Sequence, residues 1–255
     1  MEFLAAGPQQ QEMAVASILS VCNVDAANRG NVSEAYIERD GDGNITSLHG
    51  LGQERSTTTG KDTEPNFHWD MPSNIGELQH LQKLEVYNCR SLPASVGNLT
   101  NLRELSLHFC SQMATLPPEL GSLLTLTDVR IHGDTAMHRI IPCIKMLPNL
   151  KFLYYRSVNG ADKFMLRENM VEDLLDPQVQ FKQSLEILDI EGGDLLEDDV
   201  AELFAKVLPE YPNLHRVFIP NNLIRALTPI LKAQPDVIPP TVRLRRPTEW
   251  QRHGA

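Results

Sequence analysis

The sequence predicts an α/β solenoid, in which a curved parallel β-sheet lines the concave side and loops or short helices form the convex side. Three successive units share one pattern between residues 71 and 134: MPSNIGELQHLQKLEVYNC, LPASVGNLTNLRELSLHFC and LPPELGSLLTLTDVRIHGD. One leucine of this pattern recurs at steps of 21, 24 and 24 residues, at Leu81, Leu102, Leu126 and Leu150. A period in this range indicates stacked units, because each unit is too small to bury its own apolar face.

Each unit contains the core L-x-x-L-x-L, which predicts a short strand. Alternate residues of a strand point to opposite faces, so the second and third apolar residues of the core face inward. These pairs are Leu84/Val86, Leu105/Leu107, Val129/Ile131 and Leu153/Tyr155. The segments 75–78, 96–99, 120–123 and 144–147 bring the chain back along the convex side. A proline at residues 72, 93, 117 and 142 suits the start of each return, where no backbone donor is needed.

This pattern resembles the leucine-rich repeat, L-x-x-L-x-L-x-x-N/C-x-L, in its plant-like variant with L-P-x-x-I-G-x-L. The resemblance covers residues 71–222 strongly and residues 36–48 weakly, and it is similar to the repeat parts of plant disease-resistance proteins and Ras-group intracellular repeat proteins. It implies recognition of other proteins, commonly on the concave surface. Cys89 and Cys110 of this chain match the N/C position of the repeat pattern, where we expect reduced, buried thiols that donate to neighbouring backbone carbonyls.

The segments on the N-terminal side of the repeats are expected to form a cap. Residues 10–24 have the apolar spacing of a short amphipathic helix. Residues 36–48 alternate around a turn at 40–43, which predicts a hairpin, so residues 1–48 form an N-terminal helix and capping hairpin. Residues 49–70 are polar and lack a period, and are expected to be an insertion loop on the convex side, with Trp69 packed against the solenoid.

Later units are longer and include helices. Strand cores follow at Leu185 and Leu214, and helical patterns cover 162–176 and 197–208, similar to the longer repeats of ribonuclease-inhibitor-like proteins. We expect the solenoid to span 71–235 and to end in a capping helix at 223–232. Residues 236–255 are expected to be a basic, mainly solvated tail, with a site for an acidic partner as the alternative.

The turn at 40–43 also permits a calcium hypothesis. Asp40, Asp42 and Gly43 match positions 3, 5 and 6 of an EF-hand loop. Position 1 would be Glu38, and position 12 would be His49 instead of the bidentate glutamate. A plain turn is therefore favoured, and calcium binding stays open.

Composition limits the partners. The net charge of −10 argues against nucleic acid as the main partner. No apolar run reaches the length of a membrane span, and the N-terminus lacks the basic start of a secretory signal. We expect a cytoplasmic monomer, although a truncated start would leave an extracellular location open. The sequence contains no nucleophile, zinc-protease, P-loop or dinucleotide motif, so we expect no enzyme activity, cofactor or metal.

Binding is therefore expected on the concave face. The strand positions that point away from the core carry aromatic, basic and acidic residues, of which aromatics and arginine are enriched at protein interfaces. The candidate protein-binding residues are Glu85, Tyr87, Ser106, His108, Arg130, His132, Tyr154, Arg156, Asp189 and Phe218. The predicted function is that of a non-catalytic protein-interaction module that binds a protein or peptide. Signalling or defence is the expected setting. The alternatives are a ligand-sensing fragment of a larger receptor kinase or nucleotide-binding immune receptor, a GTPase regulator, and a calcium-gated adaptor.

Overall fold

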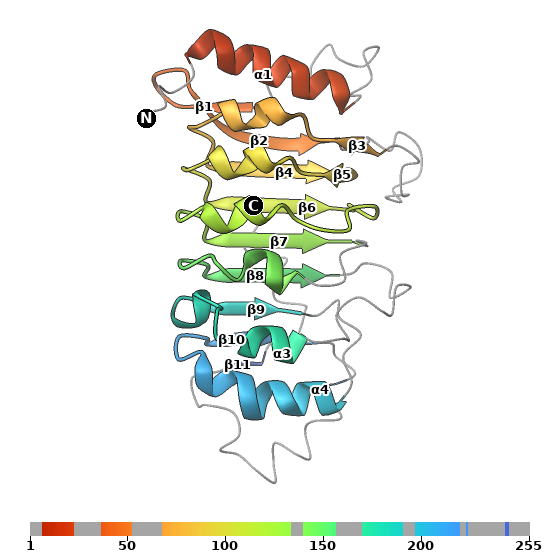
Figure 1. Cartoon of the computed structure of the whole chain (residues 1–255), viewed down its shortest axis with the longest axis vertical. Coiled ribbons are helices and arrows are strands. Elements are labelled where there is room, and N and C mark those ends of the chain that lie inside the picture. The colour runs from red at the N-terminus through yellow and green to blue at the C-terminus, as the bar shows by residue number, and fades with distance from the viewer. Residues whose placement is uncertain are drawn as a thin grey trace.

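One nine-stranded sheet runs the length of the molecule (Figure 1). The computed structural model describes residues 7–22, 37–52, 68–133, 140–156, 170–190, 197–219, 223 and 243–244. Strands β1 and β2 are antiparallel, and every later neighbouring pair of this sheet is parallel. In spatial order the strands are β1 (Ile37–Arg39), β2 (Ile45–Leu51), β4 (Lys83–Tyr87), β6 (Glu104–His108), β7 (Asp128–His132), β8 (Phe152–Arg156), β9 (Ile187–Asp189), β10 (Arg216–Phe218) and β11 (Arg243–Leu244).

The chain returns between strands through short helices on one face of the sheet. Each of the first three returns is a 3-10 helix preceded by a proline in extended conformation, and the fourth, α2, has Pro142 in its first turn. These elements are η2 (Ser73–Glu77), η3 (Ala94–Asn98), η4 (Pro118–Ser122) and α2 (Ile141–Ile144). The predicted role of the prolines is confirmed.

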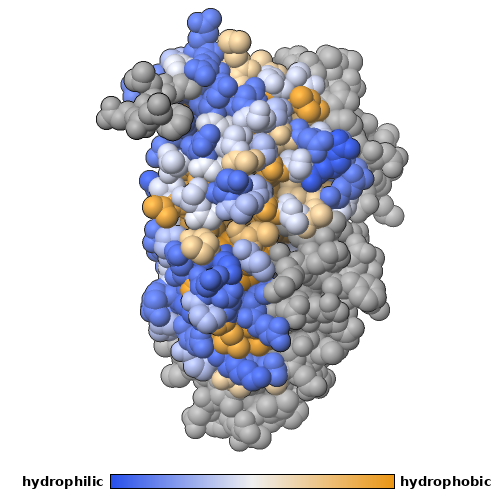
Figure 2. All heavy atoms as spheres, viewed as in Figure 1, coloured by the Kyte–Doolittle hydropathy of each residue, from blue (hydrophilic) through white to orange (hydrophobic). Residues whose placement is uncertain are grey.

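The described surface in Figure 2 is mostly hydrophilic, with small apolar patches between polar side chains.

The repeat leucines form one core between the sheet and these returns. The four leucines that set the period are all completely buried, and the predicted inward-facing pairs of β4, β6, β7 and β8 are at most 4% exposed. The predicted strand alternation is therefore confirmed. Burial of a leucine side chain stabilises the fold by about 1.5–3 kcal/mol, and so this row supplies much of the driving force for stacking.

Side-chain hydrogen bonds join each repeat to the one before it. A polar side chain just before the first leucine of the strand core donates to a backbone carbonyl of the preceding repeat. This inter-repeat ladder consists of Asn101 to Gln79 O (2.8 Å), Thr125 to Thr100 O (2.8 Å), Asn149 to Leu124 O (2.8 Å), Ser184 to Leu150 O (2.8 Å) and Asn213 to Gln183 O (2.6 Å).

The N-terminal cap is a helix over a hairpin, as predicted. Helix α1 (Pro8–Val21) contacts η2 and buries Ala14, Val15 and Ile18. Gln11 is 1% exposed and joins the two parts of the cap, because its Oε1 accepts a hydrogen bond from the Ile45 amide (3.0 Å). The cap covers the first repeat, whose apolar face would otherwise contact water.

The carboxylate of Asp40 holds the hairpin turn together. Asp40 Oδ1 accepts the backbone amides of Asp42 (3.0 Å) and Asn44 (2.9 Å), and Oδ2 accepts the Asn44 side-chain amide (3.1 Å). These bonds lower the pKa of Asp40, the Asn44 side chain contributing most. The predicted turn is confirmed, and the Asp40 carboxylate is hydrogen-bonded within the turn itself.

The predicted loop 49–70 needs correction at both ends. Strand β2 continues to Leu51, so residues 49–51 belong to the sheet. At the other end, β3 (Trp69–Asp70) pairs with β5 (Cys89–Ser91) in a second, two-stranded sheet. Trp69 is 2% exposed and its Nε1 donates to Tyr87 O (2.8 Å), which confirms its packing against the solenoid. Residues 53–67 lie outside the described part of the chain, so the convex position expected for this loop stays a prediction.

The two cysteines at the N/C position of the repeat behave as structural thiols. Cys89 and Cys110 are buried, and their sulfur atoms donate to Ser91 O (3.1 Å) and His108 O (3.4 Å). Burial raises the pKa of each thiol to about 12. All four cysteines of the chain are free thiols.

The C-terminal half contains the expected longer helices. Of the predicted helix 162–176, α3 (Met170–Leu175) is described, and residues 162–169 lie outside the described part of the chain. The predicted helix 197–208 is the run α4 (Glu197–Glu202), η6 (Leu203–Val207) and η7 (Leu208–Glu210), and the short η5 (Phe181–Gln183) was not predicted. The predicted capping helix at 223–232 lies outside the described residues except for buried Leu223. Part of the predicted tail 236–255 is not a solvated tail, because β11 pairs in parallel with β10. None of the described helices is long and apolar enough to cross a membrane.

Candidate functional site

The face of the sheet opposite the core carries a row of stacked rings. Backbone register places Tyr87, His108, His132 and Arg156 beside one another on β4, β6, β7 and β8. The rings of Tyr87 and His108 stack with centroids 4.4 Å apart, and those of His108 and His132 stack at 4.8 Å. We call these three rings the ring row. Of Arg156 only the backbone position is described. Three of the predicted binding residues therefore form one packed unit.

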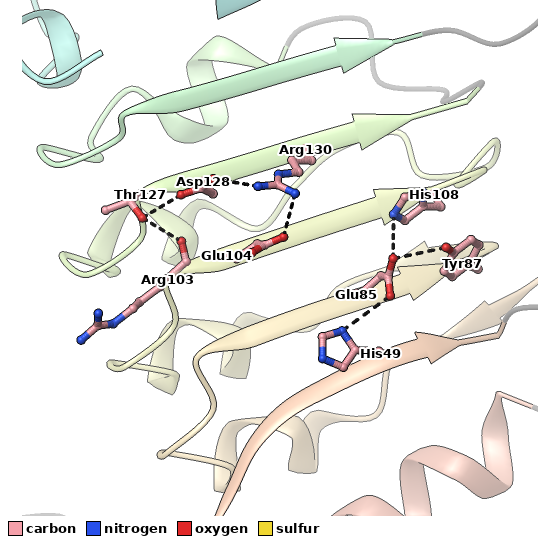
Figure 3. A network of polar contacts seen from close by, with 9 residues as sticks. All are labelled: His49, Glu85, Tyr87, Arg103, Glu104, His108, Thr127, Asp128 and Arg130. Atoms are coloured by element: carbon pink, nitrogen blue, oxygen red, sulfur yellow. Dashed lines mark hydrogen bonds and ion pairs between the residues drawn. The ribbon is translucent and has the colours of Figure 1, made fainter. Parts of the chain in front are cut away.

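Glu85 contacts the Tyr87–His108 end of the ring row (Figure 3). Its Oε1 lies 3.2 Å from His108 Nε2 and accepts the Tyr87 hydroxyl at 3.2 Å. Its Oε2 accepts the Gly50 amide (3.2 Å) and lies 3.7 Å from His49 Nδ1. Three strands thus contribute to one carboxylate. The hydrogen bond from His108 is the largest cause that holds the pKa of Glu85 below its usual value of 4.5, while burial opposes it.

We expect Glu85→Gln to remove a pH-dependent part of stability. A carboxyl whose pKa is lowered by folding stabilises the protein above its unfolded pKa, and this contribution is lost as pH falls toward the folded pKa. The unfolding midpoints in urea should therefore differ most between the two proteins above about pH 5 and converge as pH falls below about 4. A difference that stays constant across this range would show that the carboxylate charge contributes nothing.

A second network lies next to the first on the same face. Arg130 makes ion pairs with Glu104 and Asp128, each at 3.1 Å, and its guanidinium lies 5.3 Å from the centre of the Tyr154 ring. Thr127 Oγ1 is 2.9 Å from Asp128 Oδ2 (Figure 3). A cation over an aromatic face is stabilised by the ring quadrupole. Arg130 is thus already held by two carboxylates.

Four of the predicted contact residues are not available to a partner. They point away from the main core as expected, but they are nearly or completely covered. Their exposed fractions are 5% for Ser106, 6% for Tyr154, 0% for Asp189 and 2% for Phe218. Strand alternation gives the direction of a side chain and not what covers it, which is why the sequence overestimated the open surface. Of the remaining predicted residues, Glu85, Tyr87, His108, Arg130 and His132 are partly exposed.

Sequence reasoning missed several members of the two networks. His49 was placed in a loop, although it lies on β2 beside Glu85. Glu104 and Asp128 occupy the strand position before the first inward residue, which was not included among the candidates. The period of two along each strand was the available signal, because it places this position on the same face as Ser106 and Arg130. Within the described ranges, no three His, Cys, Asp or Glu side chains lie close enough together to hold a metal ion.

Comparisons with known proteins bear on the fold. No protein-family profile and no curated protein matches the sequence. A solved leucine-rich repeat protein from Bacteroides eggerthii matches 86% of this chain and 52% of its own length, with 12% identity and a TM-score of 0.51. An internalin from Listeria monocytogenes matches 63% of this chain and 43% of its own, with 19% identity and a TM-score of 0.40. The ectodomain of the receptor kinase SOBIR1 from Arabidopsis thaliana matches 76% of this chain and 98% of its own, with 16% identity and a TM-score of 0.36.

The chain thus spans about half the length of the Bacteroides protein and less than half that of the internalin. At these identities the likeness concerns the fold alone. Together with the repeat period, the parallel strand order and the proline-led returns, it establishes the fold of this chain as a leucine-rich repeat solenoid.

Proposed function

We propose that this chain is a non-catalytic interaction module that binds a protein or peptide on the N-terminal half of its concave face. The ring row and Glu85 are the observation that carries this. Tyr87, His108 and His132 are stacked by the sheet register, and all three remain partly exposed. Glu85 contacts the Tyr87 hydroxyl and His108 Nε2. Rings held in place before binding lose little conformational freedom when a partner docks, which favours affinity.

The chemistry of the surface favours a partner with both polar and flat apolar groups. Imidazole and phenol edges donate and accept hydrogen bonds, and their carbon faces offer apolar contact. The adjoining carboxylates of Glu104 and Asp128 are 25% and 16% exposed, so that they can also receive a donor from the partner. A peptide backbone or an interface loop supplies such groups. We also propose that the chain acts in signalling or defence and is located in the cytoplasm.

The test is a quantitative pull-down from extracts of the source organism. The full chain is compared with Tyr87→Ala and His132→Ala, which shorten the ring row without removing Glu85. His80→Ala is the matched control, because His80 lies in the turn before β4 and outside the ring row. We expect the proteins bound by the unmodified chain to be retained by the control and lost by both ring variants. Each captured protein is then purified and titrated by calorimetry.

In that titration each ring variant should weaken binding about tenfold or more, equivalent to about 1.4 kcal/mol. Partners that bind all four proteins equally would place recognition elsewhere and overturn the proposal. Circular dichroism of the variants checks that the solenoid is folded, so that a lost partner reports on the surface.

A further inference from the structure

A phenylalanine beside the ring row has a backbone conformation that its side chain disfavours. Phe109 directly follows the last residue of β6 and has φ +52. Among the described residues, Asn88 (φ +56) is the only other non-glycine residue with positive φ. The left-handed region brings the Cβ of an L-residue close to the following carbonyl oxygen, and a bulky residue is an outlier there.

The position in the repeat requires this conformation, whichever residue occupies it. The residues that directly follow the three rings of the ring row are Asn88, Phe109 and Gly133, and all three have positive φ. The amide of Asn88 donates to His108 O (2.9 Å), and the amide of Phe109 donates to His132 O (2.8 Å). The same bond to the next repeat thus accompanies the same turn. Asparagine and glycine adopt it more readily than phenylalanine, so the backbone gives no reason for a phenylalanine at this position.

The Phe109 ring lies beside the ring row and is partly exposed. Its centroid is 6.5 Å from that of the Tyr87 ring, and the two planes are tilted by 31°. It also lies close to Gly133, because a Cβ added to this glycine would be 2.6 Å from Phe109 Cδ1. Figure 3 shows Tyr87 and His108 near the ends of their strands. Phe109 therefore continues the ring row past the edge where the strands end.

Phe109 adds an apolar face to a surface that otherwise presents polar ring edges. The Tyr87 hydroxyl and His108 Nε2 both contact Glu85. A phenyl ring has no donor or acceptor, and it is stabilised by contact with another apolar or aromatic side chain. A partner that covers the ring row would also bury this ring. Backbone strain that the fold itself does not need is typical of binding sites.

We propose that Phe109 is an anchor for the partner, and that the binding surface extends from the concave face over the edge where the strands end. The occupant is a peptide segment of the partner that places a large apolar side chain on the Phe109 ring. This inference rests on the proposed function and deepens it, because it adds a residue and a chemical class of contact to the same surface.

The first experiment separates a binding role of Phe109 from a packing role. Phe109→Asn introduces the residue type that residue 88 has at the equivalent position. Phe152→Asn is the control, because Phe152 is also partly exposed but lies within β8. We expect the urea midpoint of Phe109→Asn to equal or exceed that of the unmodified chain, and that of Phe152→Asn to fall. A lower midpoint for Phe109→Asn would show that packing maintains this phenylalanine, and would overturn the proposal.

The second experiment measures binding by calorimetry, with the protein captured by the unmodified chain as the probe. We expect Phe109→Asn to weaken binding about tenfold or more, and Phe109→Tyr, which keeps the ring, to stay within about twofold of the unmodified chain. His80→Ala again serves as the control outside the surface.

The variants also distinguish this inference from the proposed function. If Tyr87→Ala and His132→Ala weaken binding while Phe109→Asn binds as the unmodified chain does, the proposed function stands and Phe109 is not an anchor. If all three variants bind as the unmodified chain does, or if no protein is captured, the proposed function is wrong and this inference is wrong with it.

Discussion

Leu105→Ala is expected to lower the free energy of unfolding by about 2–5 kcal/mol. Leu105 is 0% exposed and lies on β6, in register with Leu84 of β4 and Val129 of β7. Removal of its side chain leaves a cavity between two repeats, and a parallel ladder fixed on both sides cannot collapse to fill it. Urea unfolding followed by circular dichroism measures the loss.

Leu124→Ala is the matched control for that experiment. Leu124 is a leucine of a neighbouring repeat, but it lies on the surface and is 62% exposed. Its truncation should change the free energy of unfolding by no more than about 0.5 kcal/mol. Equal losses for the two variants would contradict the assignment of the inward and outward leucines.

Gly52→Ala is expected to cost about 1.5–3.5 kcal/mol, because two penalties combine. Gly52 has φ +78, and the left-handed conformation costs an L-residue about 1–2 kcal/mol. An added Cβ would also lie 2.3 Å from Trp69 Nε1 and 2.4 Å from Tyr87 O. These are the two atoms of the hydrogen bond that anchors β3, and the net loss of a hydrogen bond is about 0.5–1.5 kcal/mol.

Urea unfolding gives the overall loss, and tryptophan emission gives a local readout. Gly41→Ala is the control, because a Cβ at this position meets no atom within 4 Å. The emission of Gly52→Ala should move to longer wavelength as Trp69 becomes exposed, while that of Gly41→Ala stays at the wavelength of the unmodified chain. An unshifted spectrum and an unchanged unfolding midpoint in Gly52→Ala would contradict this packing.

The repeat period was sufficient to predict the central part of the fold. Strand alternation and the spacing of leucines are local properties, so Leu84 and Leu107 could be assigned to the core before the strands were placed. The second sheet could not be found this way. It depends on Trp69, which follows a polar segment without a pattern of its own, pairing with Cys89 of the first repeat. The pairing of β11 with β10 is equally non-local, and the two residues Arg243 and Leu244 are too few to show a period.

The candidate site likewise has one part that the repeat pattern predicts and another that depends on contacts the pattern does not contain. The ring row follows directly from register, because identical offsets in successive repeats bring Tyr87, His108 and His132 together. The network around Glu85 does not follow, since His49 belongs to a strand of irregular register whose end was read as loop. The burial of Tyr154 and Phe218 was also invisible, because the sequence pattern states a direction and contains no information about coverage.

The inter-repeat ladder has a mechanical consequence. Its bonds and the sheet bonds are repeated at each level, while the strands lie across the long axis of the molecule (Figure 1). A force that pulls the two ends apart therefore loads one level at a time, as in the opening of a zipper, and does not shear all levels together. Each level of 24 residues would release about 80 Å of chain as it opens. The solenoid should therefore yield under tension in small successive steps.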